Sequence, residues 1–278
     1  MSIAFDNVIK RIQDLPSLPA VVIELLSSME QEDIDVQTLA AKITLDQALT
    51  AKTLRLANSS FYGMSSKVTT IAQAISVLGF HSIRTIVTAC SLTGAFQDSG
   101  KGSFNFKAFW RHSVATAVCA KLLARQLRVS PDTAFTAGLL HDIGSLVLAT
   151  RFPQQYEEML AYQRANDCYL IEAERAVFEL DHAMVGSALA AYWKFPLAIQ
   201  QAVAGHHDGE PAPAPLALAV YAGNALAHAL DLSEVEDDLA PPLSAASWSA
   251  LGLDDSASGA VFLAAEKTFH EMCQILVT

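Results

Sequence analysis

Five histidines and one aspartate of this chain stand where they could share a single site: His112, His141, Asp142, His182, His206 and His207. Imidazole and carboxylate groups are good ligands for zinc, iron, manganese or nickel. A helix bundle can aim such groups inward from several helices at one point. The sequence therefore predicts a divalent-metal site, with one or two ions of undetermined identity.

The adjacent pair His206 and His207 needs a special geometry. Neighbouring residues on a helix point about 100° apart, so only one of them would face a metal squarely. Asp208-Gly209 follows directly and predicts a helix end, which removes this objection. A single buried histidine is more often an ordinary core or surface residue than a ligand, and we assign His81, His228 and His270 to that class.

The elements that position these residues are expected to be helices. The chain has 278 residues, of which 52% are hydrophobic and 17% charged, so global disorder is excluded. Alanine and leucine dominate, and alternating β-branched stretches are few. Periodicity and breakers predict helices over 5–14, 20–30, 36–44, 48–58, 70–78, 81–96, 105–127, 133–141, 154–166, 169–178, 182–193, 196–206, 216–230 and 257–276, with a break or kink at Gly144.

Loops separate some of these helices. The polar, glycine-rich stretch 97–103 is the best candidate for a boundary between subdomains. The proline-rich stretch 210–215 is expected to be a surface loop, and 233–253 a loop with at most one short helix.

Charge limits the ligands. The net charge is −11, and no cluster of Lys and Arg is present. Nucleic acid is therefore excluded as a direct ligand, whereas a small anion remains open because a metal or a local basic pair can override the global charge.

The cysteines and the hydropathy of the sequence indicate the cellular compartment. The cysteines Cys90, Cys119, Cys168 and Cys273 form no CxxC pair, so we expect buried, reduced thiols. Residues 1–10 lack the apolar core of a signal peptide, and the apolar stretch 216–230 is too short to span a bilayer. We expect a cytoplasmic protein without a membrane association.

Five short motifs carry a resemblance. Residues 138–144 (Gly-Leu-Leu-His-Asp-Ile-Gly) resemble the motif of the HD superfamily of metal-dependent phosphohydrolases. Four upstream motifs, in the same order, resemble its HDOD branch: 15–19 (Leu-Pro-Ser-Leu-Pro), 46–49 (Asp-Gln-Ala-Leu), 54–59 (Leu-Arg-Leu-Ala-Asn-Ser) and 74–79 (Ala-Ile-Ser-Val-Leu-Gly). The resemblance extends from about residue 5 to about residue 230.

The resemblance implies an all-α fold, in which a helical N-terminal subdomain packs on an HD-like helix bundle. We expect the N-terminal subdomain at 1–100, the bundle with the His/Asp site at 101–230 and a helical extension at 231–278. HDOD proteins are generally regarded as signalling modules, many of which have lost metal ligands. The related HD-GYP enzymes hydrolyse cyclic di-GMP.

The family's site residues match this chain in part. His112 matches the first histidine of the HD pattern, His141–Asp142 match its HD pair, and His182, His206 and His207 match the additional histidines of HD-GYP sites.

Three other positions depart from the pattern. The last metal-binding aspartate falls at Asn224, whose neutral amide is a weaker ligand. The HD-GYP lysine is replaced by Ser145, and Ala108 stands where those enzymes can place a glutamate. The Gly-Tyr-Pro tripeptide is absent.

Two functions remain open, beside a third interpretation in which the chain is an inactive scaffold without a metal. The first is a regulatory HDOD module that keeps a metal site, with weak or no catalysis, and acts through a signalling protein partner. The second is a metal-dependent phosphohydrolase of a nucleotide or cyclic dinucleotide, with Asp142 as the catalytic residue that bridges two ions. A small phosphorylated ligand fits either function, and Arg55, Arg84 and Arg111 are further cations that could meet an anion, although we expect the N-terminal motifs to be structural.

Overall fold

The computed structural model describes residues 5–12, 20–27, 36–63, 67–95, 103–209, 214–233 and 239–277. Every regular element within these ranges is a helix, which confirms the predicted all-α class. The motif at 15–19 and most of the stretches 97–103 and 210–215 lie outside the described residues.

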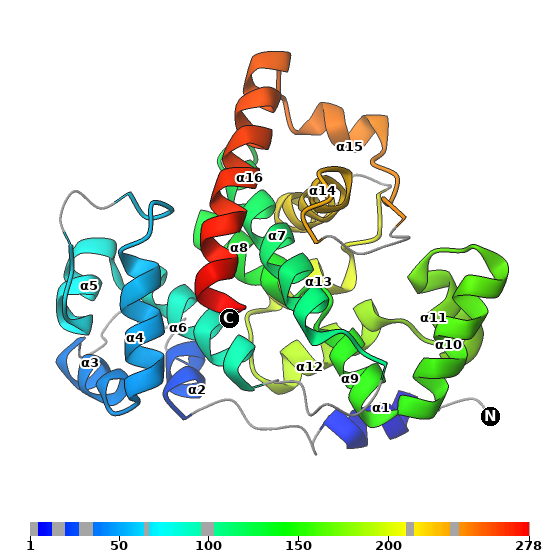
Figure 1. Cartoon of the computed structure of the whole chain (residues 1–278), viewed down its shortest axis with the longest axis horizontal. Coiled ribbons are helices and arrows are strands. Elements are labelled where there is room, and N and C mark those ends of the chain that lie inside the picture. The colour runs from blue at the N-terminus through cyan, green and yellow to red at the C-terminus, as the bar shows by residue number, and fades with distance from the viewer. Residues whose placement is uncertain are drawn as a thin grey trace.

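The N-terminal helices form a lobe at the left of Figure 1. Its members α2 to α6 pack on one another, whereas α1 lies apart, against α9 and α12 of the central bundle. The bounds of the six helices are α1 Phe5–Ile12, α2 Ala20–Ser27, α3 Val36–Thr44, α4 Gln47–Ala57, α5 Ile71–Leu78 and α6 Phe80–Ala95.

The central bundle is built around α7, which is apolar on most of its surface and packs against α8, α14 and α16. Next to it, α12 packs against both α9 and α13. The bounds are α7 Phe106–Ala124, α8 Pro131–Leu140, α9 Ile143–Arg151, α12 His182–Tyr192, α13 Leu197–Ala204 and α14 Pro215–Ala229.

Two helix pairs complete the molecule. The hairpin of α10 (Pro153–Asn166) and α11 (Leu170–Phe178) stands at the right of Figure 1. The pair α15 (Ala245–Ala250) and α16 (Asp255–Leu276) follows the bundle. Because α16 packs on α7 and also on α4 and α6, it joins the bundle to the N-terminal lobe.

Polar caps explain several helix starts. Asp46, Asn105 and Asp181 each accept a hydrogen bond from the backbone N–H three residues later, at 2.9, 3.0 and 2.9 Å. Such caps satisfy the unpaired amides of the first turn. The cap at Asp46 begins α4, and Asp181 places His182 at the first position of α12.

One prediction needs refinement. The sequence predicts a break at Gly144, but the interruption is a two-residue turn at His141–Asp142, after which α9 runs from Ile143 to Arg151. Gly144 is instead a point of close contact, since an added Cβ would lie 2.6 Å from the backbone nitrogen of Gly186 in α12.

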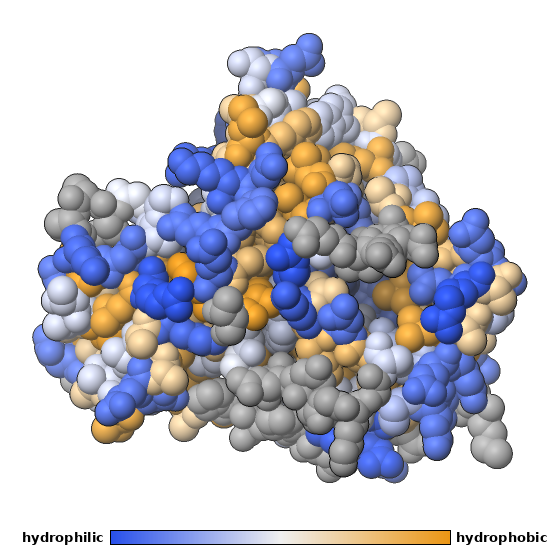
Figure 2. Space-filling model, in the orientation of Figure 1, coloured by the Kyte–Doolittle hydropathy of each residue, from blue (hydrophilic) through white to orange (hydrophobic). Residues whose placement is uncertain are grey.

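The apolar residues are largely internal. The stretch Pro131–Arg151 has the length and composition to cross a membrane, yet 83% of its apolar window is buried inside the protein, as in a core helix. All four cysteines are free. On the face shown in Figure 2, hydrophilic residues are interspersed with hydrophobic ones, and apolar residues gather between α16 and α15.

Candidate metal centre

The structure brings the predicted His and Asp residues together from several helix ends. They are His112 inside α7, His141 at the end of α8, Asp142 in the turn before α9, His182 at the start of α12, and His206 and His207 in the turn after α13. The turn that follows α13 frees His206 and His207 from helical spacing, as the sequence predicted.

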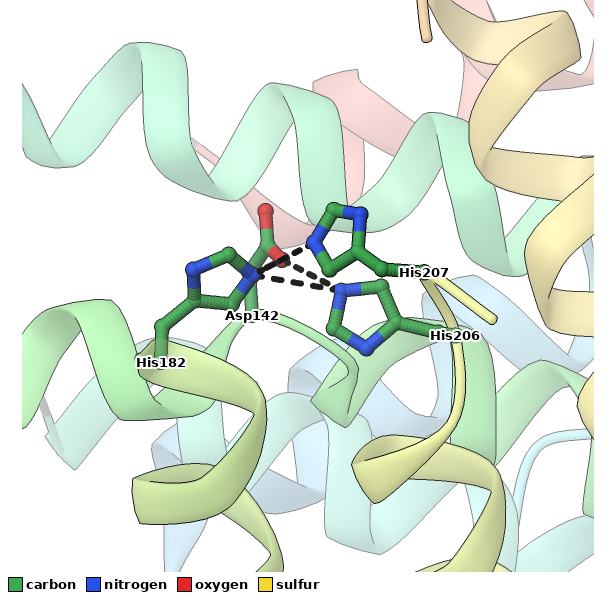
Figure 3. Close-up of side chains that lie close together, drawn as sticks. All are labelled: Asp142, His182, His206 and His207. Carbon is green, nitrogen blue, oxygen red and sulfur yellow. Dashed lines mark hydrogen bonds and ion pairs between the residues drawn. The ribbon is translucent and has the colours of Figure 1, made fainter. Parts of the chain in front are cut away.

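One group of ligand atoms surrounds His182. Its Nε2 lies 3.2 Å from Asp142 Oδ1, 3.2 Å from His206 Nε2 and 2.8 Å from His207 Nε2. Figure 3 shows these four side chains pointing toward one another. Each offers one ligand atom, and these atoms all lie within 4.8 Å of one another.

A second group shares the same aspartate. Asp142 Oδ2 lies 3.3 Å from His141 Nε2 and 3.6 Å from His112 Nε2, and the two imidazole nitrogens are 3.1 Å apart. The two oxygens of one carboxylate therefore face two different clusters. This is the arrangement of a carboxylate that bridges a pair of ions.

The hydrogen bonds of the outer ring nitrogens fix where the protons are. His141 Nδ1 lies 2.7 Å from the Gly138 carbonyl, and His206 Nδ1 lies 2.7 Å from the Val203 carbonyl. A carbonyl only accepts, so both Nδ1 atoms carry a proton, and in the neutral form of either ring the Nε2 atom presents a lone pair to the centre.

His182 is oriented by a carboxylate instead. Its Nδ1 donates to Glu174 Oε2 at 2.6 Å, and its backbone N–H donates to the same oxygen at 2.8 Å. Glu174 is fully buried. A carboxylate behind a histidine is a common support for metal ligation, because it fixes the ring and raises its basicity.

The donor set thus fits a divalent cation. The Nε2 lone pairs of His141 and His206 face the centre, and a cation bound there would accept both lone pairs together with the Asp142 carboxylate. The geometry of the ligand atoms is therefore suited to a cation.

The electrostatics agree with this description. Burial lowers the pKa of His112, and the charge of His141 lowers it further. Burial also lowers the pKa of His206, to about 4, so both rings are neutral at pH 7. Burial alone would raise the pKa of Asp142, but His141 and His182 outweigh it and hold that pKa well below its usual range.

His182 has the opposite shift. Burial would lower its pKa, but the carboxylates of Glu174 and Asp142 raise it well above the ordinary value. Without a metal, a proton on His182 therefore offsets the negative charge of the site. The same charge would attract a cation.

The positions that depart from the HD pattern lie beside the centre. Asn224 and Ser145 are buried and line the same cavity as His112. Asn224 Oδ1, Ser145 Oγ and His112 Nδ1 have no hydrogen-bond partner. Unpaired buried polar atoms are costly, so these three mark a place that a further polar group would complete.

Sequence reasoning missed two residues near the centre. His228, which we assigned to the ordinary class, lines the cavity, with its ring centroid 4.5 Å from that of His112. Its spacing of four from Asn224 puts both on one face of α14 and could have indicated this. Glu174 has no such signal, because nothing in its spacing shows that it faces His182.

The clusters open into a cavity of about 640 Å³. Its other walls are mainly aromatic and apolar and include Phe104, Phe109, Tyr156 and Leu170. Among the described residues that line it, Arg175 is the only arginine and lysine is absent. Arg175 also pairs with Asp181, Nε and Nη2 lying 2.9 and 2.8 Å from Oδ2.

Comparison with known proteins finds a matching family and similar solved structures. The family model of the HDOD domain matches residues 15–209. An HDOD domain protein of unknown function from Geobacter sulfurreducens has 23% sequence identity and a TM-score of 0.80, over 97% of this chain and 98% of that one. A candidate phosphohydrolase from Shewanella amazonensis has 27% identity and a TM-score of 0.76, over 97% of each chain.

A third solved structure is the response regulator MmoQ from Methylococcus capsulatus. It is 29% identical, with a TM-score of 0.51, over 89% of this chain and 98% of that one. The chain spans only 40% and 30% of the lengths of two curated relatives that it matches, both uncharacterised.

Proposed function

We propose, from the fact that this chain belongs to the HDOD domain family, that it is a metal-binding signalling module with weak or no catalysis. In this function the metal centre stabilises one arrangement of the helices, and a signalling protein partner recognises that arrangement. The similarity to a response regulator supports the signalling part of the proposal.

The single observation that carries the metal part is the convergence of the Nε2 atoms. His141 and His206 are fixed with their Nδ1 protons on backbone carbonyls, and their lone pairs face Asp142. We assign one ion to His112, His141 and Asp142, with Asn224 as a neutral neighbour. We assign a second ion to Asp142, His182, His206 and His207. A bound divalent ion would supply a Lewis acid and an acidic water.

Weak catalysis follows from the residues that would handle a phosphate ester. Ser145 is too short to reach a phosphate as a lysine would, and Asn224 adds no negative charge to hold the ion at His112, His141 and Asp142. The remaining cation at the cavity, Arg175, is engaged by Asp181. Little positive charge is thus available to balance a phosphate in a transition state.

One observation favours a second candidate function, metal-dependent phosphohydrolysis. The cavity of about 640 Å³ is large enough for a small phosphorylated ligand, and the clusters with Asp142 form part of its wall. In this alternative Asp142 is the catalytic residue, because it would contact both ions and orient the attacking water. A nucleotide or a cyclic dinucleotide is the substrate class, and the cytoplasm is the compartment in which we place either function.

Elemental analysis of the full chain, purified without chelators, tests the metal site. We expect at least one equivalent of iron, manganese, zinc or nickel per chain. Asp142→Asn should lose most of it, because this carboxylate is shared by both clusters, whereas the exposed His270→Ala should keep it. Metal-free wild-type protein, or an Asp142→Asn protein that retains the full metal content, contradicts the assignment.

Activity measurements separate the two functions. We expect the metal-loaded protein to be nearly inert toward phosphomonoesters, nucleotides and cyclic dinucleotides. Turnover at an ordinary enzymatic rate of roughly 1 s⁻¹ or more, abolished by His141→Ala, would replace the signalling module with the phosphohydrolase.

A further inference from the structure

Arg84 of α6 is a buried cation that the metal centre does not use. The residue is 8% exposed, and its Nη1 is buried without a hydrogen-bond partner. Its Nη2 lies 3.0 Å from His81 Nδ1, and its guanidinium carbon lies 5.9 Å from the centre of the Phe80 ring. Neither contact supplies a negative charge.

The neighbouring carboxylate is already engaged. Asp132 Oδ1 accepts from Lys121 Nζ at 3.0 Å, and Oδ2 accepts from Ser82 Oγ at 2.8 Å. Among the residues that the structure describes, no carboxylate oxygen lies within 4.0 Å of the Arg84 guanidinium. The carboxylate of Asp132 and the two cations Lys121 and Arg84 therefore lie between α6, α7 and α8. One negative charge faces two positive charges, so one positive charge is uncompensated.

A small cavity adjoins this charge. It is lined by Arg84, by the threonines Thr85, Thr88, Thr133 and Thr136, and by Phe195 and Ile199. Its volume of about 10 Å³ accommodates one single-atom occupant, the size of a water or a halide. The hydroxyls of Thr136 and Thr85 donate to the Asp132 backbone carbonyl at 3.0 and 3.5 Å, so the donors left for an occupant are Arg84 Nη1 and the hydroxyls of Thr88 and Thr133. Donors that no carboxylate oxygen contacts favour an anion over a cation.

We propose that this cavity binds one small monovalent anion, of the size of chloride, between Arg84 and the threonine hydroxyls. The ion neutralises the unpaired guanidinium and joins α6 of the N-terminal lobe to α8. Sulfate, phosphate and organic acids are too large for the cavity. The site is separate from the metal centre, so the proposal does not depend on the proposed function.

Thermal unfolding of the full chain tests the proposal. Chloride or bromide is titrated against gluconate, so that the ionic strength and the unit charge of the anion stay constant. We expect a saturable rise in the unfolding midpoint, of about 3–6 °C when the halide reaches about ten times its Kd. Equal midpoints in gluconate and halide overturn the proposal and leave the cavity to water.

A variant and a direct measurement locate the ion. Arg84→Met should abolish the difference between halide and gluconate, whereas the matched control Arg164→Met, an exposed arginine of α10, should keep it. Bromide-soaked crystals of the unaltered protein should show an anomalous peak beside Arg84 Nη1, which tests the site even if Arg84→Met does not fold. A halide effect that persists in Arg84→Met, or a cavity without the peak, overturns the assignment.

Discussion

At the scale of single residues, Glu174 is the side chain outside the ligand set with the most direct contact to it. One of its oxygens accepts both the ring N–H and the backbone N–H of His182. Its other oxygen is buried without a partner. The negative charge of Glu174 therefore acts mainly on His182, whose ring it orients and makes more basic.

We predict that Glu174→Gln weakens metal binding about 10- to 100-fold while the fold is retained. The amide keeps the shape and can still accept from His182, but it removes the charge that raises the basicity of the ring. Competition with a metal-binding dye measures the affinity, and Glu158→Gln on the exposed side of α10 is the control. Unchanged affinity in Glu174→Gln would show that the contact is only structural.

Asn224 gives a second prediction at this scale. Its unpaired Oδ1 is buried beside the cluster of His112. Asn224→Asp should raise the affinity for the ion at His112, His141 and Asp142, because a carboxylate offsets the metal's charge better than an amide does.

The same substitution should lower the stability of the metal-free protein, since it buries a charge without a partner. Thermal unfolding with and without added manganese or zinc measures both effects. A metal-induced shift of the midpoint no larger than in the wild type would contradict the prediction.

At the scale of elements, the close approach of α9 and α12 brings Asp142 to His182. Gly144 is the second residue of α9, where its lack of a side chain lets the backbone of α12 approach. Asp142 directly precedes α9 and His182 begins α12, so the separation of these two ligands depends directly on how closely the two helices pack.

We predict that Gly144→Ala destabilises the protein by about 1–3 kcal/mol or more, because its methyl group would meet the backbone of His182 and Gly186. Metal content should fall with stability as Asp142 and His182 move apart. Gly94→Ala, in α6 and without atoms near the added methyl, should be neutral or stabilising. Urea unfolding and elemental analysis of both variants measure this difference.

At the scale of the whole molecule, Lys121 links the bundle to the N-terminal lobe. Its ammonium lies 4.0 and 4.3 Å from the ring centres of Phe61 and Tyr62, which follow α4, and pairs with Asp132 at the start of α8. Its side chain is only 15% exposed.

Lys121→Met should cost about 2–4 kcal/mol of unfolding free energy, because it removes the contacts with both rings and leaves Asp132 without its ion pair. The exposed pair of Lys42 and Glu24 is the internal control, and Lys42→Met should cost about 0–1 kcal/mol. If urea unfolding shows the same loss of unfolding free energy for Lys121→Met and Lys42→Met, Lys121 does not stabilise the contact between the bundle and the N-terminal lobe.

Metal removal belongs to the same scale, because the proposed ligands come from α7, α12 and the turns that follow α8 and α13. We expect a chelator to lower the free energy of unfolding by about 2.7 kcal/mol for free metal at about 100 times Kd. Hydrogen exchange should increase at the ends of those helices rather than in α3 or α5. A uniform increase in hydrogen exchange along the chain would contradict a local effect of metal removal.

The sequence by itself determined the helical class, most helix bounds and the family. Those depend on local signals: apolar periodicity, a cap such as Asp46, a breaker such as Gly79 and the motif around His141–Asp142. The sequence also identified the histidines that converge, because they match the histidines of the HD and HD-GYP pattern in the same order along the chain.

Only the tertiary structure decided which atoms of these residues meet. Four features of the structure each involve residues from separate elements. They are the division of Asp142 between two clusters, the support of His182 by Glu174, the place of His228 beside His112 and the unpaired charge of Arg84. Spacing along the chain relates residues of one helix, such as Asn224 and His228, but gives no distance between residues of different elements. The packing of α9 on α12 and of α6 on α8 sets those distances, and with them the chemistry available to the site.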